Sequence, residues 1–234
     1  MKTRHPEVVS LMARFDGLFA DPVALERQLV RERVVREESA KDRPWRENSF
    51  TPEISYGRHR GPAPRSCFPA SVLAAILPKE NRWVIPLTLR PTHLPDHAGQ
   101  VSLPGGRREG QESAWQTACR EMNEELGFPT ESLMRVGELP RLYVYASRHD
   151  VTPVVAVGKS FPELTPCPEE VAQVLLLPIE DLLELAPTER EMTRGAMLFR
   201  APGFWVDGHW VWGATAMILG ELRDWLLRIE SWQE

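Results

Sequence analysis

Three glutamates crowd one short segment near the middle of this 234-residue chain. Glu121, Glu124 and Glu125 stand at positions i, i+3 and i+4, so in a helix their carboxylates share one face. Like charges at this spacing repel, and a purely structural helix gains nothing from them. A divalent cation would explain the arrangement, because Mg²⁺ prefers carboxylate oxygens and keeps waters that a phosphate can displace. The alternative, from this spacing alone, is an ordinary charged surface helix.

The flanking residues predict the helix that would position these carboxylates. Ser113 and Gln116 have the spacing of a capping box, which marks a helix start, and Gly127 fits the residue that ends a helix. Apolar residues recur every four positions and form a stripe that can lie on a sheet: Ala114, Ala118 and Met122. The sequence therefore predicts a helix over residues 113–126 with its glutamates away from that stripe.

Two neighbours of the glutamates suit the same site. Arg120 precedes Glu121 and stands one turn before Glu124, where its charge could neutralise or orient a carboxylate. The Gly105-Gly106 pair lets the backbone approach a metal ion or a phosphate closely, because glycine has no Cβ.

The rest of the chain divides into an N-terminal extension, residues 1–66, and a folded domain, residues 67–234. Residues 7–38 have a helical pattern, and residues 39–66 are rich in Pro, Gly and Arg, as expected of a linker or an arm draped over the domain. After residue 66, strand patterns alternate with helix patterns, which predicts an α/β or α+β domain with helices covering a sheet. Strands are expected over residues 70–77, 83–89, 143–145, 151–157 and 171–177. A hairpin around Asp207-Gly208 is expected within residues 204–211, and further helices over 179–185 and 214–229. Pro86 indicates an edge or a bulge in its strand.

Composition excludes several classes of protein. The chain is 42% hydrophobic and 26% charged, which is typical of a globular domain and not of a disordered or collagen-like chain. Its formal net charge of −5 argues against a protein that binds nucleic acid through the phosphate backbone, and no run is long and apolar enough for a membrane span. The three scattered cysteines and the lack of a secretory signal pattern lead us to expect a reducing, cytoplasmic location.

The longer spacing around the glutamates is more specific than the glutamates alone. It reads G-x5-E-x7-R-E-U-x-E-E-x-G-U, where U is apolar, with its fixed positions occupied by Gly106, Glu112, Arg120, Glu121, Met122, Glu124, Glu125, Gly127 and Phe128. This pattern is similar to the Nudix box, and the chain resembles a Nudix hydrolase. The resemblance implies an α/β/α sandwich with a mixed β-sheet, here with the N-terminal helical extension added. It also implies hydrolysis of a nucleoside diphosphate derivative with Mg²⁺ or Mn²⁺.

A second stretch resembles the coenzyme A pyrophosphatase branch of that family. Its signature, L-T-x-R followed by a loop and G-x3-F-P-G-G, is matched at Leu87, Thr88, Arg90, Gly99, Pro104, Gly105 and Gly106 and differs at Pro91, Pro95 and Leu103. Coenzyme A or an acyl-coenzyme A is therefore the expected substrate, with 3′,5′-ADP and 4′-phosphopantetheine as products. ADP-ribose, NADH or a dinucleoside polyphosphate are alternative substrates, and a non-catalytic binding module of the same fold is a further alternative.

The resemblance also implies roles for single residues. Metal ligands would be the Gly106 carbonyl, Glu121, Glu124 and Glu125. Glu121 is the first candidate for the base and Glu170 the alternative, while Glu112 would support the loop or the outer metal shell. Phosphate oxygens could be met by residues in or beside the signature loop: Arg90, His93, His97 and Arg107. The expected partner is a small nucleotide rather than nucleic acid or a membrane, and a homodimer is left open.

Overall fold

The computed structural model describes residues 48–52, 63–94, 97–194 and 197–230, together with six single positions before residue 28. Those six are Met12, Asp16, Gly17, Phe19, Asp21 and Arg27. The other residues of the helices predicted over 7–38, and most of the linker predicted over 39–66, lie outside the described residues. The division of the chain at residue 66 stays a prediction.

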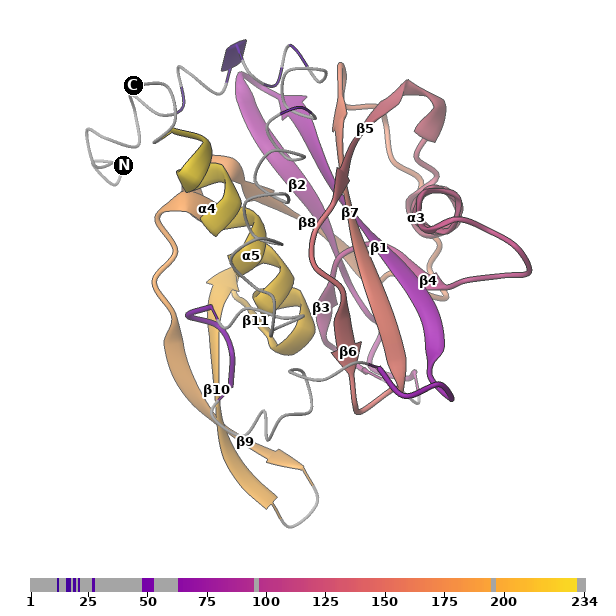
Figure 1. The fold of residues 1–234 in the computed structure, drawn as a ribbon. Coiled ribbons are helices and arrows are strands. Elements are labelled where there is room, and N and C mark those ends of the chain that lie inside the picture. Colours follow the sequence, from indigo (N-terminus) through magenta and orange to yellow (C-terminus); the bar gives the residue numbers. More distant parts are fainter. Residues whose placement is uncertain are drawn as a thin grey trace.

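The described residues form a large mixed sheet with helices on both sides (Figure 1). Its strands are β1 (Phe68–Lys79), β2 (Arg82–Leu89), β3 (Val101–Ser102), β4 (Gly105–Arg107), β5 (Leu133–Glu138), β6 (Leu142–Val144), β7 (His149–Gly158) and β8 (Gln173–Pro178). The order β3-β2-β1-β7-β5 runs across the sheet, with β4 on β1, β6 on β7 and β8 on β2. β1 and β7 are parallel, whereas the other pairs are antiparallel. This architecture confirms the expected fold class.

Alternation along β1 divides the core into two layers. Leu73, Ala75 and Leu77 face helix α3 (Ala114–Leu126), and the residues between them face helix α5 (Gly213–Glu230) on the other side of the sheet (Figure 1). Side chains of consecutive strand residues point to opposite faces, so a strand that is apolar throughout can serve both layers. The glutamate-bearing helix is thus fixed on the sheet by its apolar stripe, with Ala118 and Met122 fully buried.

Pro86 lies in a gap of the sheet. Val84 pairs with both Leu77 of β1 and Pro178 of β8, and Thr88 pairs with both Ser102 of β3 and β8. Between these two points β2 has a partner only on the β8 side, so the missing N–H of proline breaks no ladder. On the unpaired side the two ends of β2 bond to β1 and to β3, so the predicted edge is present only locally, around Pro86.

A smaller three-stranded sheet, β9 (Thr188–Arg194), β10 (Met197–Val206) and β11 (His209–Trp212), lies against α5. Helix α4 (Ile179–Leu183) precedes it, and a 3₁₀ turn, η2 (Thr130–Ser132), follows α3. The hairpin predicted at Asp207-Gly208 is present, and both residues have the positive φ of a tight turn, 47° and 80°. Strands β3, β4, β5 and β9 had not been predicted. No helix in the described part of the chain has the length and apolar character needed to cross a bilayer.

Described residues of the extension pack into the domain core. Phe50 is fully buried, with its ring 5.4 Å from that of Phe204. Asn48 donates from Nδ2 to the carbonyl of Met217 in α5 at 2.8 Å. Phe19 is also buried, with its ring 5.0 Å from that of Trp83. These positions therefore contribute to the core of the domain.

We expect Phe50→Leu to lower the free energy of unfolding by about 2 kcal/mol, because the smaller side chain leaves a void against Phe204 and α5. Urea denaturation followed by tryptophan fluorescence measures this change. Leu198→Ala is the matched control, since Leu198 is 63% exposed and its truncation should change stability by less than about 0.5 kcal/mol. Equal stabilities of both variants and the wild type would contradict the structural role of Phe50.

Candidate functional site

The helix predicted for the glutamates is present and begins one residue later, at Ala114. Ser113 Oγ accepts from the backbone N–H of Gln116 at 3.2 Å, and Gln116 Oε1 accepts from the Ser113 N–H at 2.8 Å. This capping box pairs backbone donors that have no partner inside the helix. Gly127 ends the helix with φ of 63°, and its N–H bonds to the Asn123 carbonyl. Both ends of the helix are therefore set by local sequence.

Arg120 is the centre of the polar network on this helix. Its Nη1 donates to Glu121 Oε1 at 2.9 Å and to Glu124 Oε2 at 2.7 Å. Its Nε donates to Glu112 Oε1 at 2.9 Å, and its Nη2 donates to the Arg107 carbonyl at 2.9 Å. Ion pairing with these carboxylates, first with Glu112, raises the pKa of Arg120, so the guanidinium stays charged. One cationic side chain thus binds the loop, the helix and β4 together.

Glu112 is held by the same network. Its carboxylate also accepts from the Thr117 hydroxyl at 2.9 Å and from the Glu109 N–H at 3.1 Å. The hydrogen bond from Arg120, followed by that from the Glu109 backbone, lowers the pKa of Glu112 to about 2. The side chain is therefore ionised at neutral pH, in a position that supports the loop before α3.

The two glycines make room for different neighbours. A Cβ on Gly106 would overlap the carboxylate of Glu121, so this carboxylate lies directly on the β4 backbone. A Cβ on Gly105, which has φ of 153°, would instead meet backbone atoms of Ser71 and Val72 in β1. The pair thus allows one close approach by a functional side chain and one by a neighbouring strand.

Glu125 is the most deeply buried carboxylate of the site. It is 3% exposed, and its Oε2 has no hydrogen-bond partner. Burial, and after it the negative charge of Glu121, raises the pKa of Glu125 to about 8. The Gly105 amide and the charge of Arg90 act in the opposite direction. Burial likewise raises the pKa of Glu121. An unpartnered buried carboxylate is costly, and a cation beside it would relieve that cost.

Glu170 reaches this site from the loop between β7 and β8. Its charge acts on the pKa of both Glu121 and Glu125, so the three carboxylates are neighbours. Two backbone hydrogen bonds hold this loop on the end of α3. The Thr165 N–H donates to the Leu126 carbonyl at 2.9 Å, and the Cys167 N–H donates to the Glu125 carbonyl at 2.8 Å. The side chain of Glu170 is exposed, so solvent reaches it.

The candidate phosphate-binding residues are dispersed. Arg90 lies close enough to Glu125 to affect its pKa, and its Nε is buried without a partner. His93 is exposed, and no described interaction joins it to the glutamates. His97 Nδ1 hydrogen-bonds Gln100 Oε1 at 2.9 Å, while Arg107 stacks on Phe68, 4.0 Å from the ring centroid. Sequence analysis missed Arg148 and His149, which lie beside Arg107; only the fold brings them there.

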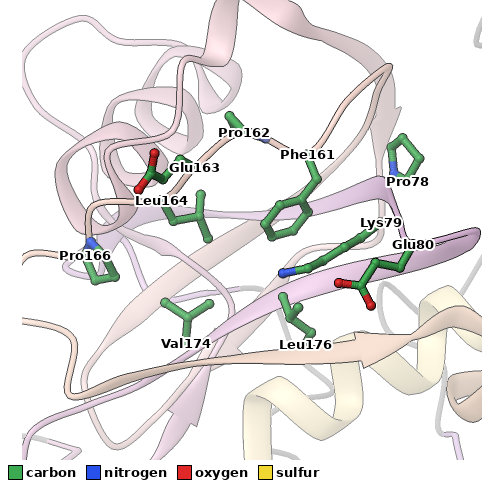
Figure 2. A pocket seen from close by; sticks show the side chains of 10 residues that line it. All are labelled: Pro78, Lys79, Glu80, Phe161, Pro162, Glu163, Leu164, Pro166, Val174 and Leu176. Carbon is green, nitrogen blue, oxygen red and sulfur yellow. The ribbon is translucent and has the colours of Figure 1, made fainter.

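A hollow of about 750 Å³ lies elsewhere, between the end of β1, the loop after β7 and strand β8 (Figure 2). The ammonium of Lys79 lies 4.4 Å from the centroid of the Phe161 ring, above a floor of Val174 and Leu176. None of the candidate site residues named above lines this hollow. The glutamates therefore do not line this hollow and form a separate site beside β4.

The residues at the glutamate site fit a hard divalent cation. The donors are carboxylate oxygens, Glu125 Oε2 has no partner, and the missing side chain of Gly106 lets the Glu121 carboxylate lie against the β4 backbone. Within the described residues no three His, Cys, Asp or Glu side chains already surround one point as ligands. Arg120 instead bridges Glu121 and Glu124. Cation binding would therefore need these two carboxylates to turn from Arg120.

The buried Glu125 predicts how stability depends on pH. Its pKa is about 8 in the folded protein against 4.5 ordinarily, so between these values the folded state keeps a proton that the unfolded chain releases. The free energy of unfolding of the metal-free protein should therefore fall as pH rises from 4.5 to 8, by on the order of 4 kcal/mol. The pKa of Glu112 is lowered to about 2, so its titration changes the free energy of unfolding only below about pH 4.5.

Urea unfolding in EDTA at several pH values from 5 to 9 measures this effect, and Glu125→Gln isolates it because glutamine does not titrate. The variant should have a flatter pH profile than the wild type and be more stable above pH 8. Identical profiles would show that Glu125 ionises normally in the folded protein.

Comparisons with a family model and with known proteins agree on one family. A family model described as NUDIX domain matches residues 68–196. The chain is 33% identical over 157 residues to "Uncharacterized Nudix hydrolase NudL" of Yersinia enterocolitica, a match that covers 66% of this chain and 80% of that protein. It is 34% identical over 159 residues to the protein of the same name from Pectobacterium atrosepticum, covering 65% and 80%.

Solved structures resemble the described fold at lower identity. One is the Nudix hydrolase RenU of M. smegmatis, with a TM-score of 0.46 and 17% identity over 70% of this chain and 84% of that one. Another is the NUDIX domain of Shewanella oneidensis NrtR, crystallised with ADP ribose, with a TM-score of 0.41 and 18% identity over 58% and 89% of the two chains.

Proposed function

The chain belongs to the Nudix hydrolase family, and on that premise we propose that it hydrolyses the pyrophosphate bond of coenzyme A or an acyl-coenzyme A. The family supports pyrophosphate hydrolysis of a nucleotide derivative. The narrower substrate is supported by the L-T-x-R and G-x3-x-P-G-G pattern that leads directly into Gly105 and Gly106. The products would be 3′,5′-ADP and 4′-phosphopantetheine.

One observation carries the proposal: the orphaned carboxylate oxygen of Glu125 lies in the same cluster as Glu121 and Glu170. Glu121, Glu124, Glu125 and the Gly106 carbonyl would hold Mg²⁺ or Mn²⁺. When bound, such a cation neutralises charge on the pyrophosphate and acidifies a water for attack at phosphorus.

The side chains divide the remaining work. Glu121 is our first candidate to accept the proton of the attacking water, because its carboxylate lies on the Gly106 backbone at the centre of the cluster. Glu170 is the alternative, since it neighbours Glu121 and Glu125 and is open to solvent. Arg120 would orient the carboxylates, and Glu112 would hold Arg120 in place. Arg90, which lies near Glu125 and has a buried Nε without a partner, would meet a phosphate oxygen.

The proposal extends to setting and partners. A cytoplasmic location is supported by the free thiols of Cys67, Cys119 and Cys167. The partner would be a small nucleotide rather than nucleic acid or a membrane.

A substrate panel with Mg²⁺ and with Mn²⁺ tests the function. Coenzyme A, acyl-coenzyme A esters of several lengths, ADP-ribose, NADH and a dinucleoside polyphosphate are compared by kcat/KM, with the products identified. We expect the highest value for a coenzyme A compound and release of 3′,5′-ADP. Preferred cleavage of another nucleotide would overturn the substrate, and no cleavage of any would favour a binding module.

A further inference from the structure

Two guanidinium groups and an imidazole surround Phe68 where β1 begins. The guanidinium carbon of Arg107 lies 4.0 Å from the centroid of the Phe68 ring, and that of Arg148 lies 5.6 Å from it. The ring of His149 is 6.0 Å away, centroid to centroid, on the strand residue that pairs with Phe68. We call these residues, together with the neighbouring His97, the Phe68 cluster.

The positive charges of the Phe68 cluster are not balanced by a carboxylate among the described residues. Arg107, Arg148 and His149 form no ion pair there, and Arg148 Nη2 donates instead to the Ser66 carbonyl at 3.1 Å. Burial, and after it the charges of Arg107 and His97, lower the pKa of His149. Two guanidinium groups without a carboxylate partner form a favourable place for an anion, and the imidazole beside them can donate an N–H to it without carrying a charge.

The backbone fixes the members of the cluster in place. Arg148 and His97 both have φ of 57°, in the left-handed region that residues other than glycine rarely adopt. The Arg148 carbonyl accepts from the Phe68 N–H at 2.9 Å, which ties this turn to β1. The Arg107 guanidinium lies over the Phe68 ring, a contact that uses none of its N–H donors in hydrogen bonds and leaves them available to an anion.

The cluster lies next to the glutamates but on the other face of the sheet. Arg107 directly follows Gly106, and its carbonyl accepts from Arg120. Arg107 pairs with Ala70, which faces the core beneath α5, whereas Gly106 faces Glu121. Since β4 has a described partner only on its β1 side, a ligand at the glutamates can pass around its free edge to the cluster.

We propose that the Phe68 cluster binds a phosphate monoester carried by the nucleoside, separate from the pyrophosphate that is cleaved. Two guanidinium groups and an imidazole supply planar and directed donors suited to the terminal oxygens of such a group. The inference rests on the proposed function for the identity of the substrate. Coenzyme A carries a phosphate monoester on its ribose, and ADP-ribose and NADH do not, so the cluster would select between these classes.

Binding of two product-like probes tests the cluster without catalysis. Isothermal titration of the full chain in EDTA compares 3′,5′-ADP with AMP, which lacks the second phosphate. We expect the bisphosphate to bind at least about tenfold more tightly. In Arg107→Gln and in Arg148→Asn this ratio should fall to about twofold or less. Asparagine is chosen at position 148 because it tolerates a positive φ.

Arg200→Asn is the matched control, since it removes one positive charge from a side chain that is 67% exposed on β10. It should keep the wild-type ratio. Equal binding of both probes by the wild-type chain, or an equal loss of both in the cluster variants, would overturn the proposal.

Turnover separates a failure of the inference from a failure of the proposed function. If coenzyme A is not cleaved but the bisphosphate preference persists, the substrate is another nucleotide with a phosphate monoester and the cluster assignment stands. The opposite outcome is that coenzyme A is cleaved, but wild type and Arg148→Asn each cleave it with the same kcat/KM as dephospho-coenzyme A. In that case the function stands and the cluster assignment fails.

Discussion

Glu125→Gln should lower kcat by about a thousandfold, and Glu121→Gln should lower it by a comparable factor. Glutamine keeps the shape of the side chain but removes the negative charge that a hard divalent cation requires. Water cannot replace the lost ligand easily at position 125, because the site of this carboxyl is only 3% exposed. The measurement is kcat at saturating Mg²⁺ on whichever nucleotide of the panel is cleaved best.

The control is Glu131→Gln, which removes an exposed carboxylate just after the helix and should leave kcat within about twofold of wild type. Folding is followed by thermal denaturation, where Glu125→Gln should equal or exceed the wild type. A lower kcat with unchanged or higher stability would identify Glu125 as a group kept for function. Wild-type rates in both glutamine variants would refute the metal site.

Gly106→Ala should lower kcat by about a hundredfold or more, although the protein still folds. The new methyl group would occupy the place of the Glu121 carboxylate, which lies at the end of a flexible side chain and can turn away. Stability should change little, while a cation ligand or base would be displaced from its working position. Steady-state kinetics over a range of Mg²⁺ concentrations measures the loss.

Two other glycines provide controls for this substitution. Gly105→Ala meets the backbone of Ser71 and Val72, which cannot turn away, so we expect it to destabilise the sheet. Gly17→Ala meets no atom within 4 Å and should leave both stability and kcat close to wild type. If Gly106→Ala resembled Gly17→Ala in its kinetics, the close approach of Glu121 to β4 would have no functional importance.

Features that depend on neighbouring residues in sequence could be predicted. The capping box, the apolar stripe and the terminal glycine together fixed α3 to within one residue, because each acts over three or four positions. Long apolar runs likewise predicted β1, β2 and β7. The tight turn at Asp207-Gly208 predicted the hairpin.

Features that depend on pairing between distant residues could not be predicted. Strand β9, TEREMTR, has a charged sequence with little intrinsic preference for a strand, and only its pairing with β10 makes it one. Strand β5 contains an irregular register between Arg135 and Gly137, which obscures its alternation.

The same distinction applies to the candidate site. His93 was predicted to bind phosphate together with Arg90 and Arg107 because all three lie in or beside one loop. Position in a loop does not determine where each side chain points. Arg148 joins Arg107 because β7 begins beside β1, a contact between segments far apart in sequence.

The long strand β1 has a consequence for how this molecule opens. Its first part pairs with β7 and β4, and its last residues pair with β2, so one strand belongs to both halves of the sheet. Neither half can separate without breaking hydrogen bonds that the other half needs. Native-state hydrogen exchange should therefore report one cooperative unit, with the amides of β1 and β7 exchanging only on global unfolding. Access to the glutamates then depends on side chains and loops, such as the turning of Arg120, and not on partial unfolding of the sheet.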